Sequence, residues 1–192
     1  AGFVMDAFNV AFRIPNLLRD LLAETALSAA FVPVLAAEKA KGKEAQNRLA
    51  SNIFNVLFVV AGVISLVGLI AAPHLAKWIA FGFSKEPGKI ELTAQLTAVL
   101  FPFLLFVSLA AWAMSYLNTE KSFFVPSAAP ALLDLCWIIV PLLTFSWYVA
   151  RGKEPIFGLA IGVLVGGAVQ FLVQTPSLRR KGFRWSPILS VR

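Results

Sequence analysis

The stretch Asp6–Val34, DAFNVAFRIPNLLRDLLAETALSAAFVPV, decides the fold. It is apolar enough to lie in a membrane, yet it contains five charged residues. On a helical wheel of about 100° per residue, its polar residues share one arc of about 120°. These residues are Asp6, Asn9, Arg13, Asn16, Asp20, Glu24 and Ser28, with Arg19 just beyond the edge of the arc.

This polar stripe needs water or partners if the helix crosses a membrane. A lone charge at the bilayer centre costs between about 2.5 and 17 kcal/mol, depending on the method of measurement. The stripe therefore predicts a water-filled cavity or neighbouring charged groups. Taken alone, the same pattern also fits a soluble amphipathic helix or a helix that lies flat at the membrane surface.

Composition favours the membrane. The 192 residues are 59% hydrophobic and 14% charged, and the mean hydropathy is +0.79. Soluble domains are nearer 45–50% apolar and about 25% charged. The net charge of +7 comes without a soluble basic patch beside aromatic residues, so no nucleic-acid partner is expected. A single cysteine, Cys136, excludes an internal disulfide and a thiolate metal site.

The hydrophobic pattern predicts an all-α, polytopic membrane helix bundle with about five transmembrane helices. Pro15 is expected to kink or break the first of them, and Pro102 to interrupt the third. Gly158, Gly162 and Gly166, spaced by four, predict a close helix–helix contact in the fifth. The predicted spans are residues 5–37, 49–72, 92–117, 128–148 and 156–178.

The Lys and Arg residues predict the orientation. An odd number of spans puts the two ends on opposite sides, and the richer side is cytoplasmic by the positive-inside rule. The first span then enters from the outer face, and the basic C-terminal tail is cytoplasmic. The richer side holds Lys39, Lys41, Lys43, Arg48, Lys121, Arg179, Arg180, Lys181, Arg184 and Arg192, against Lys77, Lys85, Lys89, Arg151 and Lys153 on the other.

The charged residues of the stripe fit transport better than catalysis. The sequence has no HExxH, GxSxG or Walker motif and no Cys/His cluster, so neither an enzyme, a cofactor nor a metal site is expected. Arg13 and Arg19 are candidates for binding an anion, because a guanidinium matches phosphate oxygens in pairs. Asp20 and Glu24 are candidates for proton or cation coupling, or for structural ion pairs that hold the bundle. Asp134 reads more simply as a helix-terminal carboxylate one turn after Pro130.

The same residues carry a family resemblance. The first stretch resembles the second membrane helix and following loop of the MurJ (MviN) lipid II flippases, which belong to the multidrug/oligosaccharidyl-lipid/polysaccharide exporter superfamily. The match extends along nearly the whole chain. The matching positions include Asp6-Ala7-Phe8, Phe12-Arg13-Ile14-Pro15-Asn16, Arg19, Ala23-Glu24, Ser28, Ala30-Phe31-Val32-Pro33, Phe101-Pro102, Leu117-Asn118-Thr119 and Gly166-Gly167-Ala168-Val169-Gln170-Phe171.

The resemblance implies about fourteen membrane helices in two lobes around a central cationic cavity. It implies transport of lipid II, the undecaprenyl-pyrophosphate-linked disaccharide-pentapeptide, across the bacterial cytoplasmic (inner) membrane. Residues 1–192 would be a partial N-terminal lobe without its first helix, in contact with membrane lipids and the remaining helices. Asp6, Arg19 and Glu24 match charged cavity residues of the family. Asp20 and Asp134 depart from it, because a basic residue and an asparagine are more usual there.

The substrate-binding set that follows is Asp6, Arg13, Asn16, Arg19, Asp20, Glu24 and Ser28. Flipping of lipid II by alternating access is the leading hypothesis. One alternative is export of another lipid-linked sugar or of a drug. Another is a non-transporting membrane scaffold whose polar stripe binds a partner helix.

Overall fold

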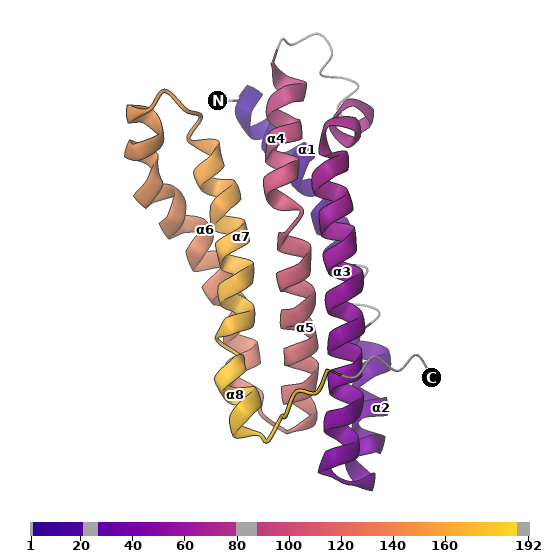
Figure 1. The fold of residues 1–192 in the computed structure, drawn as a ribbon. Helices are drawn as coiled ribbons and strands as arrows, with labels where there is room; N and C mark the ends of the chain where they lie inside the picture. The colour runs from indigo at the N-terminus through magenta and orange to yellow at the C-terminus, as the bar shows by residue number, and fades with distance from the viewer. Residues whose placement is uncertain (1, 21–26, 80–87, 188–192) are drawn as a thin grey trace.

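The computed structural model describes residues 2–20, 27–79 and 88–187, with no strand in this part of the chain. The side chains of residues 27–30 also lie outside the description. The helices form an elongated bundle (Figure 1). In chain order they are α1 (Gly2–Arg19), α2 (Leu27–Lys41), α3 (Lys43–Ile79), α4 (Lys89–Leu100), α5 (Phe103–Thr119), α6 (Phe124–Ala150), α7 (Ile156–Leu172) and α8 (Thr175–Arg180).

Four stretches of this bundle are long and apolar enough to cross a membrane. They are Lys43–Ile79, Lys89–Thr119, Phe124–Ala150 and Ile156–Arg180. The predicted all-α, polytopic membrane helix bundle is therefore confirmed. The first predicted span covers α1, α2 and residues 21–26, which lie outside the described residues, so this span stays a prediction.

Proline acts differently at three positions. The expected interruption at Pro102 is present, because α4 ends at Leu100 and α5 begins at Phe103. Pro15 does not break α1, which continues to Arg19 with Pro15 buried in its packed face. α3 likewise continues through Pro73 to Ile79, beyond the expected end at residue 72.

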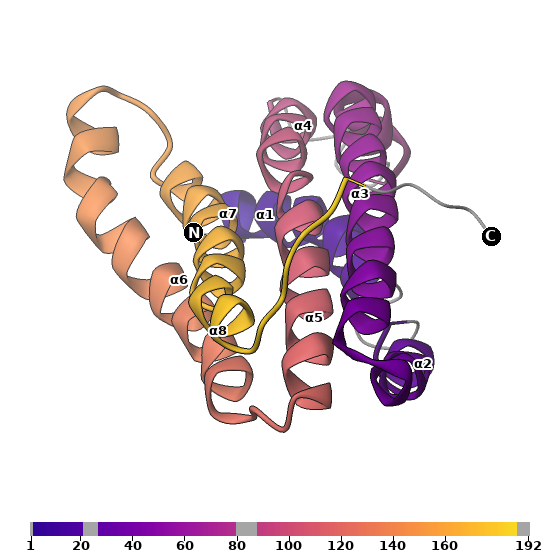
Figure 2. The same ribbon diagram turned by 60° about the horizontal axis from the view of Figure 1, so that its bottom comes forward.

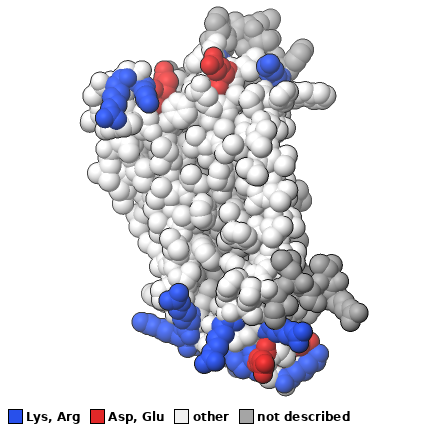
Figure 3. All heavy atoms as spheres, viewed as in Figure 1, with Lys and Arg blue, Asp and Glu red and all other residues white. Residues whose placement is uncertain are grey.

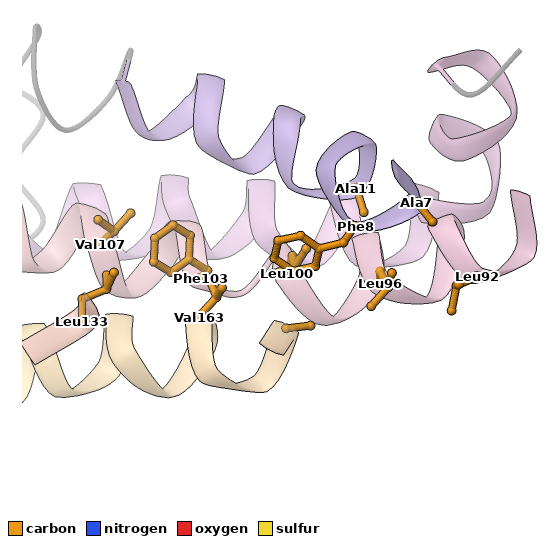
Figure 4. Packing of buried hydrophobic residues seen from close by; sticks show 11 residues of the cluster. Ala7, Phe8, Ala11, Leu92, Leu96, Leu100, Phe103, Val107, Leu133 and Val163 are labelled. Atoms are coloured by element: carbon orange, nitrogen blue, oxygen red, sulfur yellow. The ribbon is translucent and has the colours of Figure 1, made fainter. Parts of the chain in front are cut away.

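The apolar face of α1 packs onto the broken α4–α5 pair. Ala7, Phe8 and Ala11 are at most 4% exposed and share one buried cluster with Leu96 and Leu100 of α4. Figure 4 shows these side chains between the helices. In Figure 2, α1 crosses behind α4 and α5, from the side of α7 toward the side of α3. Burial of this face leaves the polar side of α1 pointing away from the bundle.

Glycine brings α6 and α7 together, as predicted. A Cβ atom on Gly162 would lie 3.0 Å from the carbonyl oxygen of Cys136, and one on Gly166 would lie 3.0 Å from that of Leu133. Both distances are tighter than ordinary van der Waals contact. The two backbones therefore touch where only hydrogen occupies the position of a side chain.

On the face seen in Figure 3, the charged residues gather at the two ends of the bundle. On the face seen in Figure 3, the middle of the surface carries no Lys, Arg, Asp or Glu among the described residues. At the end predicted to be cytoplasmic, Glu120 holds three elements together. Its carboxylate lies 3.1 Å from Nζ of Lys39 and 2.9 Å from Nζ of Lys43, and it accepts a hydrogen bond from Gln46.

Candidate functional site

The predicted site residues of α1 share one side of the helix. Asp6, Asn9 and Arg13 are exposed, whereas Asn16, Arg19 and Asp20 are partly exposed. α1 buries its opposite face, so the polar side is the one that this part of the chain leaves uncovered. Glu24 lies outside the described residues, and Ser28 lies in α2 with its side chain outside the description. The position of these two relative to the stripe stays a prediction.

Asp6 at the outer end of the stripe is held by a lysine of α4. Nζ of Lys89 lies 3.2 Å from Oδ2 of Asp6. The lysine side chain is 4% exposed and that of Asp6 is 55% exposed. A buried ammonium is costly to desolvate, so Lys89 ties α1 to the start of α4 by an ion pair with one buried member.

Sequence reasoning missed Lys89 and grouped it with the lysines of the outer loops. A pattern that points to it is present in the sequence, because Lys89, Thr93 and Thr97 recur every four residues. All three are buried in α4. The hydroxyl of Thr93 donates to the carbonyl oxygen of Lys89 at 2.7 Å, which satisfies this polar row within its own helix. A charged residue that begins such a row belongs to the packed side of the helix.

Arg19 at the inner end of the stripe pairs with its neighbour in sequence. Its Nε and Nη2 both donate to Oδ1 of Asp20, at 3.2 and 3.0 Å. The acidic residue at position 20 therefore neutralises part of the charge of Arg19. Within the described residues, no carboxylate is in ion-pair contact with Arg13. Arg13 is the guanidinium of the stripe that is exposed and available for an anion.

A cavity of about 380 Å³ lies beside Arg19. We call it the inner cavity. Its walls come from α1, α5, α6 and α7, so it joins the stripe to the helices that follow later in the chain. Its lining includes Arg19, Ala110, Asp134, Gln170 and Gln174.

Asp134 occupies a different position from the helix-terminal one expected. α6 begins at Phe124 rather than at residue 128, so Pro130 lies beyond the first turn. At about 1.5 Å per residue, Asp134 is then about 15 Å along the helix. Its side chain lines the same cavity as Arg19. Because α6 begins earlier than the sequence predicts, Asp134 lies within the span and is not a helix-terminal carboxylate.

Comparison with known proteins decides the family. The family model described as "Lipid II flippase MurJ" matches residues 1–192. The chain belongs to the MurJ family. It is similar to "Lipid II flippase MurJ" of Burkholderia cenocepacia, with 41% identity over 176 residues, which cover 91% of this chain and 33% of the relative.

Two further relatives agree with this assignment. Both are described as "Probable lipid II flippase MurJ". The protein of Rhizobium tropici is 39% identical over 94% of this chain and 34% of its own length. The protein of Vibrio cholerae is 38% identical over 95% of this chain and 35% of its own length. The chain thus spans about a third of the length of the curated MurJ relatives that it matches.

Membership of the MurJ family also fits the location that the composition predicts. With four apolar stretches among its described residues that are long enough to cross a membrane, the chain is a multi-pass protein of the bacterial inner membrane. α1 then lies against membrane-spanning helices, with most of its polar face turned away from them. Such a face needs water, an anionic ligand or other helices against it, because charged groups are costly in the hydrocarbon region.

Proposed function

We propose that the protein flips lipid II across the cytoplasmic membrane by alternating access. The observation that carries the proposal is the uncovered polar face of α1 in a chain that belongs to the MurJ family. Lipid II carries a pyrophosphate between its lipid and its sugars. The anionic centre of this substrate matches the arginines of the stripe.

Arg13 and Arg19 have different roles in this proposal. Arg13 is exposed and has no carboxylate against it among the described residues, so it makes the first contact with the pyrophosphate. Arg19 is already bonded to Asp20 and joins when the anion competes with that carboxylate. Asn16, one turn from each, supplies neutral hydrogen bonds. Asp20 keeps Arg19 from holding the substrate so tightly that release becomes slow.

The proposed work is movement, not bond making. An ion gradient or the membrane potential supplies the free energy for this movement. It does so by shifting the populations of two conformations that bind the substrate with different affinities. Asp6 and Lys89, joined at the outer end, keep α1 and α4 together during this movement. Glu24 and Ser28 belong to the predicted substrate-binding set by their place in the sequence pattern.

Rescue of bacterial cells depleted of their own flippase tests the proposal. Arg13→Gln and Arg19→Gln should insert into the membrane at normal levels but fail to restore growth, and lipid II should stay inaccessible from outside. Arg151→Gln is the matched control, because Arg151 is exposed and stacks on Trp147 at 4.0 Å, away from the stripe. Full rescue by both stripe variants would show that these arginines do not bind the substrate. Normal growth without external lipid II would instead favour another lipid-linked cargo.

A further inference from the structure

A segment without helix or strand follows α8 and lies along one side of α3. It comprises residues 183–187 and runs from the end of α8 past α5 to α3, as the yellow trace in Figure 2 shows. The side of α3 that it meets carries polar side chains at every fourth residue. We call this set the α3 column, and its members are Asn47, Ser51 and Asn55.

Each member of the α3 column donates a hydrogen bond to the main chain of the segment. Taken in chain order, the bonds measure 2.8, 3.4 and 3.0 Å and end on the carbonyl oxygens of Gly182, Arg184 and Ser186. Four residues of a helix rise about 6 Å, and two residues of extended chain span about 6.6 Å. The two periods match, so the α3 column binds every second carbonyl group of the segment whatever its side chains are.

Ser51 and Asn55 each make a second bond to the segment. The hydroxyl of Ser51, which is fully buried, also accepts a hydrogen bond from the amide of Ser186 at 3.1 Å. One hydroxyl can donate and accept at the same time. The indole Nε1 of Trp185 donates to Oδ1 of Asn55 at 2.9 Å. Residues 184–186 are therefore tied to α3 by hydrogen bonds that converge on two side chains.

Phe183 holds the start of the segment by apolar contact. Its ring lies edge-on to the rings of Trp112 and Tyr116 of α5, with centroids 5.1 and 5.2 Å apart. Its amide donates to the carbonyl oxygen of Leu178 in α8 at 3.0 Å. Trp185, in contrast, is 56% exposed. The first residue of the segment is thus anchored in the aromatic cluster, whereas the residues after it gain little from apolar burial.

The hydrogen bonds alone hold residues 184–186 weakly. A hydrogen bond contributes, on balance, about as much free energy as ordering the backbone of one residue costs, because the same groups bond water when the segment is released. The freed hydroxyl of Ser51 can bond a carbonyl oxygen in the preceding turn of α3, as serines in helices do. Release therefore leaves few polar groups unsatisfied, and the bound and released forms lie close in free energy.

We propose that the α3 column is a docking surface for extended main chain, and that residues 184–186 occupy it reversibly as a clasp anchored by Phe183. The closed clasp joins α8 to α3 past the end of α5. Gln174, which lines the inner cavity, directly precedes α8, so the clasp restrains the helix that continues this wall. In a protein that moves between two conformations, such a joint restrains the inner end in one of them and frees it in the other.

A permanent brace is the competing explanation for the same contacts. A brace is released only when the whole bundle unfolds, whereas a clasp opens while α5 stays folded. Amide hydrogen exchange separates the two, because it reports local opening apart from global unfolding. The inference concerns the docking of this segment alone, so it stands whether or not the protein transports lipid II.

Hydrogen exchange of the purified chain in lipid nanodiscs, read by mass spectrometry with residue-level fragmentation, tests the proposal. The amide of Ser186 should exchange more slowly than in a free peptide of the same sequence, but on the order of a hundredfold faster than the amides of α5. Ser51→Ala should speed this exchange by a factor on the order of ten and leave α5 unchanged, because it removes two bonds to the segment. Ser65→Ala on the same helix is the matched control, since its buried hydroxyl has no hydrogen-bond partner in the described part of the chain.

Trp185→Phe keeps the test decisive if Ser51→Ala does not fold. It keeps an aromatic ring at an exposed position and removes only the donor to Asn55, so it should also speed the exchange of Ser186. Exchange of Ser186 as slow as that of α5 would make the segment a permanent brace and overturn the proposal. Exchange as fast as in the free peptide would show that the segment does not dock. Unchanged exchange in both variants would show that the α3 column does not hold it.

Discussion

Replacing Asp6 by asparagine should destabilise the protein more than replacing its partner Lys89 by methionine. The two side chains differ in exposure, 55% for Asp6 and 4% for Lys89. In Asp6→Asn the buried ammonium loses its carboxylate and cannot be rehydrated in place. In Lys89→Met the carboxylate left behind is half in contact with solvent, where water can replace the lost partner.

The expected magnitudes follow from this asymmetry. Breaking a buried pair costs about 3–5 kcal/mol, and an exposed pair contributes about 0–1 kcal/mol. Lys89 keeps other interactions, including one with the ring of Phe3, whose centroid is 5.3 Å from Nζ. We therefore expect a loss of about 2–3 kcal/mol in unfolding free energy for Asp6→Asn. For Lys89→Met the loss should be about 1 kcal/mol or less.

Unfolding of the purified protein by a denaturing detergent in mixed micelles, followed by tryptophan fluorescence, measures both losses. The double variant Asp6→Asn/Lys89→Met should recover to within about 1 kcal/mol of the unmodified protein, because no buried charge remains. If Lys89→Met is as destabilising as Asp6→Asn, the reasoning from exposure is wrong. In the rescue assay, a stable double variant that fails to restore growth would give the pair a role beyond anchoring α1.

Two further predictions concern packing and the inner end of the bundle. Gly68→Ala should lower the unfolding free energy by about 1–3 kcal/mol, because the new Cβ would overlap the ring of Phe101. Gly62→Ala on the same helix is the control: its Cβ meets nothing within 4 Å, so this change should be neutral or stabilising. Equal effects of the two changes in thermal melts would refute the prediction. Burial raises the pKa of Glu120, but hydrogen bonds from Lys43, Gln46 and Lys39 outweigh this effect and hold the pKa below the ordinary value of a glutamate. Stability from Glu120 is then present above the pKa of the unfolded chain and lost as pH falls through the lower pKa of the folded state, so Glu120→Gln should flatten the acid limb of a pH–stability curve.

Local patterns predicted much of this structure. The helical stripe Asp6, Asn9, Arg13 was expected to share one face, and these three residues do so in α1. Gly162 and Gly166 were expected to form a close contact, and a partner backbone lies against each. Both depend only on helical spacing within one segment, which the sequence states directly.

The partners across the bundle were not predictable in this way. The pairing of Asp6 with Lys89 joins residues that are 83 positions apart, and helical spacing alone does not indicate which helix faces which. The start of this helix was predicted at residue 128, whereas α6 begins at Phe124. Pro126 does not prevent the earlier start, because proline is tolerated in the first turn of a helix. The earlier start places Asp134 within the membrane-spanning part of α6 instead of near its end.

The sequence by itself determined that this chain is a set of membrane helices with one polar face, because composition and hydrophobic periodicity are properties of each helix taken alone. Only the tertiary structure decided how that face is divided, with Asp6 paired with buried Lys89 at one end and Arg19 lining a cavity with helices α5, α6 and α7 at the other. The physical reason is that the free energy of a charged group in a membrane depends on its neighbours. Those neighbours come from helices that packing, and not local propensity, brings together.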